Sequence, residues 1–287
     1  MKKGLLLMAL MLIMPMLLVG CQEEGTEGLG YVRVNAEKNH VFLTDKITDP
    51  NVVIPKRSPE GDKITEIGVD YIPDPHRREA FYSIMLKEKP IIKSIKIPNS
   101  VTVIGSCSFY GCSSLTKINI PNSVTTIRSQ AFSGCVSLQS LKIPNSVTSI
   151  GSNAFFKCDK LLQEKNGVMF VDGWVVGCNS NVISVDISNA RGVAMAAFEN
   201  CRGLTSVVLP EKIKVIDNCV FQNCTGLTSV TISDSVANIN WAAFQGCTAL
   251  TDVYFTGTEQ EWAAITIDGG NEALANVTIH YNYVPEK

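Results

Sequence analysis

The chain has 287 residues, of which 45% are hydrophobic, 18% charged and 7% aromatic. This composition excludes collagen, a disordered polypeptide and a polytopic membrane protein, and the length suits one or two domains. The 25 basic and 27 acidic residues give a formal net charge of −2, so the overall charge gives no reason to expect nucleic acid as a partner.

The first twenty residues have the features of an export signal. Lys2 and Lys3 precede an uncharged apolar run from Leu5 to Val19, which is shorter than the ~20 residues that span a membrane. The run ends in Leu18-Val19-Gly20-Cys21. This ending resembles a bacterial lipobox, which implies cleavage before Cys21 and lipidation of Cys21. We predict a lipoprotein signal peptide at residues 1–20; an ordinary signal peptide that ends near a cysteine is the alternative.

A short acidic segment follows the predicted lipidation site. Gln22 to Gly28 contains three glutamates and two glycines and has no apolar residue, so we expect a flexible tether at residues 21–30. Acidic residues at this place also resemble the surface-export signal of Bacteroidetes lipoproteins. The resemblance implies a lipid-anchored outer-membrane protein that faces the cell surface, and a periplasm-facing protein is the alternative.

A repeat organises most of the remaining chain. The hexapeptide Ile-Pro-Asn-Ser-Val-Thr begins at Ile97, Ile120 and Ile143, which gives a period of 23 residues. The pattern Phe-x-x-Cys-x-x-Leu occurs six times. Its aromatic and sulfur positions are Phe109, Phe132, Phe155, Phe198, Phe221, Phe244 and Cys112, Cys135, Cys158, Cys201, Cys224, Cys247. We predict that these residues form the core of a repeat array at residues 93–256.

Each unit is expected to contain a short strand, a turn and one or two helical turns. The strand prediction rests on alternating apolar residues such as Ile118 and Ile120, and the helical prediction on the three-residue spacing of Ala-Phe-x-x-Cys-x-x-Leu. A single unit cannot bury its apolar residues, but stacked units can. The fold class is therefore an α/β solenoid, a right-handed superhelix of short strands and short helical turns.

Irregular segments flank and interrupt this array. Residues 31–92 contain an expected hairpin and a degenerate unit, which we interpret as an N-terminal cap. Cys158 and Cys201 are 43 residues apart, and the Gly-punctuated apolar segment between them predicts a strand pair at about 163–182. Residues 257–287 are interpreted as a C-terminal cap, with a short helix at Thr258 to Ile265 that begins at a Thr N-cap.

The full motif is specific enough to resemble a known family. Ile-x-Ile-Pro-x-Ser-Val-Thr-x-Ile-Gly-x-x-Ala-Phe-x-x-Cys-x-x-Leu is similar to the repeat of the BspA-like, Treponema-type leucine-rich repeat family of bacterial surface proteins. The similarity extends from about Val53 to Phe255. It implies a curved leucine-rich repeat solenoid on a surface or secreted protein, and in some members an adhesive role.

The cysteines allow three interpretations. Removal of Cys21 leaves nine, an odd number, and equivalent side chains in a stack point the same way, which disfavours a full disulfide framework. A metal site is disfavoured because the chain contains no Cys-x-x-Cys pair. We therefore expect mainly buried free thiols, with one or two disulfides as the alternative.

No catalytic constellation is visible in the sequence. The histidines His40, His76 and His280 lie in the predicted hairpin, a charged insertion and the last strand. No nucleophile elbow, zinc-protease motif, Walker loop or dinucleotide fingerprint occurs. We expect a non-enzymatic protein without a catalytic, cofactor or metal site.

The predicted strands also define a candidate binding face. Outward positions along the array are occupied by Lys96, Asn119, Lys142, Asp186, Val208, Thr231 and Tyr254, and Lys117 occupies the adjacent row. Three of the lysines, Lys96, Lys117 and Lys142, would lie within about 10–15 Å of one another. We hypothesise that they meet an anionic partner, either a sulfated or sialylated glycan or an acidic protein surface. The alternative is a solvated sheet face that keeps the protein soluble.

Together these features predict a lipid-anchored leucine-rich repeat protein of the cell surface that binds without catalysis. Adhesion to a host or community protein or glycan is the expected role. A structural or assembly lipoprotein of the envelope and a polysaccharide-binding accessory protein are the alternatives. The sequence leaves the ligand, its affinity and the oligomeric state open.

Overall fold

The computed structural model describes the chain apart from residues 1–25, 34–38, 45, 69–85, 180 and 286–287. The predicted signal peptide and Cys21 lie outside the described residues. The chain divides into two compact units. Unit 1 comprises residues 1–147 and 154–161, and unit 2 comprises residues 148–153 and 162–287.

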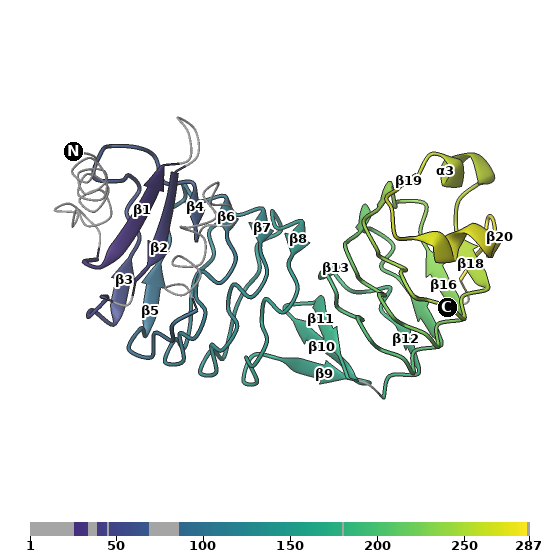
Figure 1. The fold of residues 1–287 in the computed structure, drawn as a ribbon, viewed down its shortest axis with the longest axis horizontal. Coiled ribbons are helices and arrows are strands. Elements are labelled where there is room, and N and C mark those ends of the chain that lie inside the picture. Colours follow the sequence, from purple (N-terminus) through teal and green to yellow (C-terminus); the bar gives the residue numbers. More distant parts are fainter. Residues whose placement is uncertain (1–25, 34–38, 45, 69–85, 180, 286–287) are drawn as a thin grey trace, which may run out of the picture. The chain divides into compact units, whose positions relative to one another are not determined.

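Unit 1 is a stack of coils that opens with an antiparallel hairpin of β1 (Leu29–Arg33) and β2 (Asn39–Leu43). From β2 the sheet continues in parallel through β4 (Glu66–Ile67), β6 (Val103–Ile104) and β7 (Thr126–Ile127). A second parallel pair, β3 (Asn51–Val53) and β5 (Ser94–Lys96), is extended by single bridges on later coils. Figure 1 shows the short strands at successive turns of the chain.

Unit 2 repeats this plan with longer strand rows. Five parallel strands lie in the order β12 (Ser184–Asp186), β14 (Ser206–Val208), β16 (Ser229–Ile232), β18 (Asp252–Phe255) and β20 (Thr278–His280). Three two-residue strands form another parallel sheet: β15 (Val215–Ile216), β17 (Asn238–Ile239) and β19 (Thr266–Ile267). The strand β8 (Ser149–Ile150) also belongs to this unit. Each unit is thus a β-solenoid of stacked coils.

The predicted tether ends earlier than expected. The predicted tether includes Leu29 and Gly30, but both residues are buried in β1. Leu29 is an apolar residue paired with Leu43 across the hairpin, so its burial favours strand formation over solvation.

The prediction of helical turns at Phe-x-x-Cys-x-x-Leu is wrong. Helix is confined, among the described residues, to α3 (Glu259–Ala263) and the 3₁₀ helix η2 (Glu272–Asn276). In every copy of the motif, the residues two positions before and two positions after the phenylalanine have positive φ, as at Gln130 (57°) and Gly134 (79°) around Phe132. Two left-handed residues four positions apart cannot belong to one right-handed helix. The backbone amides instead bond to the next coil, as Phe132 N does to Ala154 O at 2.8 Å.

The core consists of the predicted aromatic and sulfur rows. All six phenylalanines and all six cysteines of the motif are at most 3% exposed. In unit 1 the ring of Phe132 lies 5.2 Å from that of Phe109 and 5.5 Å from that of Phe155. In unit 2 the Phe221 ring lies 5.4 Å and 5.2 Å from its two neighbours in the row. The three-residue spacing therefore places core residues at turns rather than on a helix.

The irregular segment at 163–182 contains three strands rather than a pair. β9 (Gln163–Lys165), β10 (Val168–Val171) and β11 (Trp174–Cys178) are antiparallel neighbours, and β11 pairs in parallel with β13 (Gly192–Val193). The connections are Asn166-Gly167 and Asp172-Gly173, and all four residues have positive φ. This is the geometry of two-residue hairpin turns, for which Asn-Gly and Asp-Gly are favoured.

The C-terminal segment contains the expected helix. α3 begins after Thr258, whose hydroxyl accepts from the Glu261 amide while the Glu261 carboxylate accepts from the Thr258 amide. This reciprocal pair satisfies amides at the helix N-terminus. The Thr258 amide and the Thr258 hydroxyl both donate to the Glu261 carboxylate, and these two hydrogen bonds lower the pKa of Glu261. The segment ends in β20, which adds the last strand to the five-stranded sheet.

Candidate binding face

The strand face of unit 1 carries the predicted basic residues. Lys96 at the end of β5 bridges to Asn119 on the next coil, and Lys117 bridges to Ser140. The side chains of Lys96, Lys117, Asn119 and Lys142 are all exposed. Because neighbouring strands lie about 4.8 Å apart, Lys96 and Lys142 are about 10 Å apart along the row.

These lysines have no acidic neighbour on their own strand segments. Residues 51–53, 93–96, 116–119 and 139–142 contain no Asp or Glu, and within the described residues no ion pair involves Lys96, Lys117 or Lys142. Lys93, which the sequence analysis did not select, is also exposed. Lys93 precedes β5, and the outward residues were predicted from the alternation within the strands, so this pattern did not include it.

A depression of about 290 Å³ adjoins this basic row. Its lining residues come from three neighbouring coils and combine polar with aliphatic side chains: Asn51, Val52, Val53, Ser94, Ile95, Lys96, Ile97 and Asn119. The Ser94 hydroxyl donates to Asn51 Oδ1 at 2.8 Å and joins two of these coils. The basic row is thus continuous with a surface that also offers apolar contacts.

The strand face of unit 2 differs from the prediction at one position. Asp186 on β12 is exposed and Val208 on β14 is half-buried, but Thr231 on β16 is only 9% exposed. Thr231 lies in register between Val208 and Tyr254 on its two neighbouring strands. Its short side chain lies between Val208 and the larger Tyr254, so an outward direction does not make it accessible.

Tyr254 belongs to a cluster that the sequence analysis did not assemble. The ring of His280, on β20, stacks on the Tyr254 ring at 4.6 Å, and the Tyr283 ring lies at 4.7 Å. Asp252 Oδ1 is 2.7 Å from His280 Nε2, and Asp252 Oδ2 accepts from the Thr251 hydroxyl at 2.8 Å. These hydrogen bonds, first that of His280, lower the pKa of Asp252, so the carboxylate is ionised at neutral pH.

The spacing of the last strand explains why this cluster was missed. Tyr254 and His280 are register partners, yet they are 26 residues apart and depart from the 23-residue period. The segment with α3 and η2 lies between them and changes the spacing. The signal that would have found the cluster is the alternation in Thr278-Ile-His280, which matches Asp252-Val-Tyr254.

The motif cysteines form hydrogen-bonded rows. Cys135 Sγ donates to Phe109 O at 3.2 Å, Cys158 Sγ to Phe132 O at 3.1 Å, and Cys224 Sγ to Phe198 O at 3.0 Å. Each thiol thus bonds the phenylalanine carbonyl of the preceding coil. Burial raises the pKa of Cys224 and of Cys247 to about 12, so both remain thiols at neutral pH.

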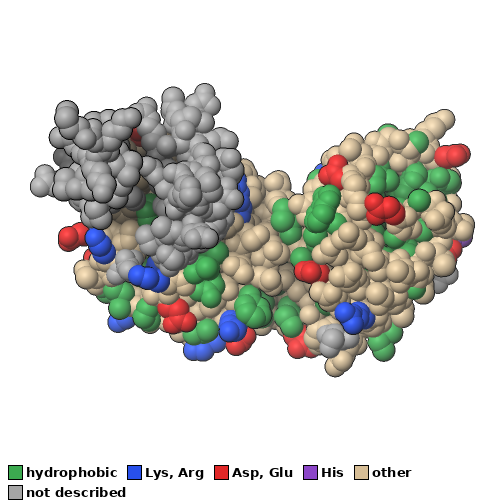
Figure 2. Space-filling model, in the orientation of Figure 1, with side chains coloured by type: hydrophobic (Ala, Val, Ile, Leu, Met, Phe, Trp, Pro, Cys, Tyr) green, Lys and Arg blue, Asp and Glu red, His purple; other side chains and the backbone are tan. Residues whose placement is uncertain are grey.

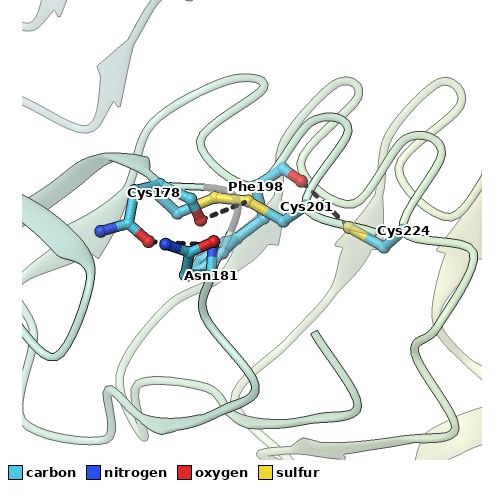
Figure 3. Close-up of a disulfide and its surroundings, with 6 residues drawn as sticks. Cys178, Asn181, Phe198, Cys201 and Cys224 are labelled. Carbon is cyan, nitrogen blue, oxygen red and sulfur yellow. Dashed lines mark hydrogen bonds between the residues drawn. A yellow bond between two sulfur atoms is a disulfide. The ribbon is translucent and has the colours of Figure 1, made fainter. Parts of the chain in front are cut away.

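One pair of cysteines forms a disulfide in unit 2. Cys178 precedes Cys201 by 23 residues, one repeat period, and their Cα atoms are 7.0 Å apart. Figure 3 shows this bond beside Phe198 and Cys224. Cys178 therefore occupies the cysteine position of an irregular copy of the motif, in which Val175 replaces the phenylalanine. The other cysteines in the described part of the chain are free, namely Cys107, Cys112, Cys135, Cys158, Cys219, Cys224 and Cys247.

Other kinds of site are not apparent in the described part of the chain. No three His, Cys, Asp or Glu side chains gather there as metal ligands would, and no described helix has the length and apolarity to cross a membrane. On the face shown in Figure 2, hydrophobic side chains form small separate patches, and basic and acidic side chains are interspersed. The strand faces are therefore the best-supported candidates for binding.

Comparisons with known proteins agree with this architecture. The sequence model of the BspA type leucine-rich repeat region matches residues 79–165 and 177–282, in six copies. No curated protein matches the chain.

Solved structures with a similar chain come from several bacteria. A leucine-rich cell surface protein of Faecalibacterium prausnitzii is 20% identical over 85% of this chain and 97% of its own, with a TM-score of 0.31. A leucine-rich repeat protein of Treponema pallidum is 21% identical over 79% of this chain and 83% of its own, with a TM-score of 0.35. A leucine-rich repeat protein of Bacteroides ovatus is 21% identical over 80% of this chain and 70% of its own, with a TM-score of 0.40.

Proposed function

Because the chain belongs to the BspA type leucine-rich repeat family, we propose that it is a surface-associated repeat protein that binds a protein partner without catalysis. The partner has an acidic surface and docks on the strand face of unit 1. The observation that carries this proposal is the exposed row of Lys96, Lys117 and Lys142, which has no acidic residue on its strand segments.

The depression beside the lysines favours a protein over an anionic glycan. Val53, which is half-buried, lines it together with Lys96 and with the small exposed parts of Ile95 and Ile97, which are 5% and 8% exposed. The depression has no aromatic ring on which a sugar could pack, so a sulfated or sialylated glycan would depend mainly on the ammonium groups, whereas a protein also brings apolar side chains to the centre of an interface. Charge complementarity would speed the encounter, and the apolar contacts would slow dissociation.

The charge-reversal variant Lys96→Glu/Lys117→Glu/Lys142→Glu tests this function. We expect it to lose at least about tenfold in affinity for immobilised acidic extracellular-matrix proteins, because three attractions become repulsions. Surface plasmon resonance at several salt concentrations measures the affinity and its salt dependence.

The matched control is Lys160→Glu/Lys212→Glu/Lys214→Glu, which makes the same change in net charge at exposed lysines elsewhere. If the control weakens binding as much as the test variant, net charge is responsible and the proposed face is wrong. A heparin-coated surface separates the glycan alternative, since retention on heparin but not on protein would favour an anionic glycan.

The proposed location is the outer surface of the cell, with lipid at Cys21 as the anchor. The support is the lipobox-like sequence at Leu18 to Cys21 and the acidic segment after it. Protease treatment of intact producing cells is expected to digest the protein, with a periplasmic protein as the control that stays intact. Protection of this chain together with the control would favour the periplasmic, assembly-related alternative.

A further inference from the structure

The cluster at the end of the strand face of unit 2 has the composition of a small-ligand site. It joins three adjacent aromatic rings, Tyr254, His280 and Tyr283, to the carboxylate of Asp252. The side chains of His280 and Asp252 are 41% and 33% exposed, and both tyrosines are half-buried. The cluster is therefore packed enough to hold its geometry and open enough to meet a ligand.

Several polar atoms of the cluster have hydrogen-bonding capacity left. No hydrogen bond to another described residue is made by the hydroxyls of Tyr254 and Tyr283 or by His280 Nδ1. Each Asp252 oxygen accepts one hydrogen bond, while a carboxylate oxygen can accept two. The cluster thus offers a ligand both donors and acceptors.

The surroundings of the cluster are neutral and rich in hydroxyl groups. In the strand rows, the position of Asp252 is occupied on the other coils by Ser184, Ser206, Ser229 and Thr278. The hydroxyls of Ser184 and Ser206 are 2.7 Å apart. This row has no lysine or arginine and differs from the basic strand face of unit 1.

We propose that this cluster binds a neutral saccharide. A sugar ring has an apolar C–H face, which packs on an aromatic ring, and vicinal hydroxyls, which both donate and accept hydrogen bonds. The tyrosine rings supply the first contact. The lone pairs of Asp252 that are not used by His280 and Thr251 can accept from sugar hydroxyls, and the hydroxyls of Tyr254 and Tyr283 can donate to them or accept from them.

The geometry favours a sugar over a cationic ligand. An ammonium group would pair with a free carboxylate and the faces of surrounding rings. Here Asp252 is already bonded to His280, and the Tyr254 ring is stacked on His280 at an interplanar angle of 13°. A cation would find one face of the Tyr254 ring covered and the carboxylate charge shared with the imidazole, whereas a sugar hydroxyl needs only a free lone pair of Asp252.

Titration of the full chain with neutral hexasaccharides tests the proposal, using cellohexaose, xylohexaose, mannohexaose and maltohexaose. We expect one of them to bind at millimolar or lower concentration in calorimetry and to shift the amide resonances of residues 252–254 and 278–283. Asp252→Asn and Tyr283→Ala should each weaken that binding by about tenfold, and Tyr283→Phe should retain most of it.

Trp241→Ala is the matched control, because Trp241 is an aromatic residue of the same unit that is 54% exposed and lies outside the cluster. The proposal is overturned if no hexasaccharide binds, if binding is unchanged in Asp252→Asn and Tyr283→Ala, or if tetramethylammonium binds the same residues and the sugars do not. The site is independent of the lysines of unit 1, so the triple lysine variant should bind the sugar normally.

Discussion

Replacing Phe132 with alanine is expected to lower the free energy of unfolding by about 3–5 kcal/mol. Phe132 is fully buried, and its ring lies between those of Phe109 and Phe155 in unit 1. The substitution would remove its contacts with both neighbouring rings and leave a cavity. Hydrogen bonds between coils hold the backbone on either side, so one coil cannot collapse into the cavity. Urea denaturation followed by circular dichroism measures the effect.

Phe156→Ala is the control for this experiment. Phe156 follows the core phenylalanine of the same motif, but its side chain is 53% exposed, and we expect a change within about 0.5 kcal/mol. Equal effects of the two substitutions would contradict a stacked aromatic core.

Loss of the Cys178–Cys201 disulfide is expected to lower the free energy of unfolding by about 3 kcal/mol, as loop-closure entropy predicts for a loop of this length. The bond closes a 23-residue segment and ties the irregular unit to the following coil. Denaturation of Cys178→Ser/Cys201→Ser, compared with the unreduced protein, measures the loss.

Thiol titration in denaturant separates this disulfide from the free cysteines. For protein that lacks Cys21 we expect seven reactive thiols before reduction and nine after it. The free motif cysteines are not expected to exchange with the disulfide in the folded state. Exchange requires a thiolate, and the pKa of Cys224, the neighbour of Cys201 in the row, is raised to about 12. Nine reactive thiols without reductant would show that the disulfide is absent. In that case Cys178→Ser/Cys201→Ser should have nearly the same free energy of unfolding as the unsubstituted protein.

The repeat architecture was predictable because its signal recurs. Six copies of Phe-x-x-Cys-x-x-Leu locate the core, and burial of all six phenylalanines requires only that equivalent residues occupy equivalent places. The local conformation was not predictable from the same spacing. Apolar residues three apart suit a helix or a series of turns, and the left-handed positions before the phenylalanine are occupied by Gln130, Asn153 or Ala196 rather than glycine.

The binding residues were predictable only in part for the same reason. Alternation along the strands gives the outward direction of Lys96 and Lys142, but accessibility also depends on the neighbouring side chains, as Thr231 shows. The Tyr254 cluster depends on His280 and Tyr283, which follow a segment outside the period. The disulfide had a visible signal, the 23-residue interval between Cys178 and Cys201.

The bonds between coils have a consequence for how such a chain changes in evolution. Phe132 N bonds to a residue 22 positions ahead and Cys158 Sγ to one 26 positions behind, and the corresponding atoms of unit 2 follow the same offsets. Duplication of one 23-residue segment within the regular array would therefore recreate every contact without a compensating substitution. Gene duplication can lengthen such an array freely, whereas the β1–β2 hairpin and the Thr258-capped helix each occur once among the described residues and have no interchangeable copy there.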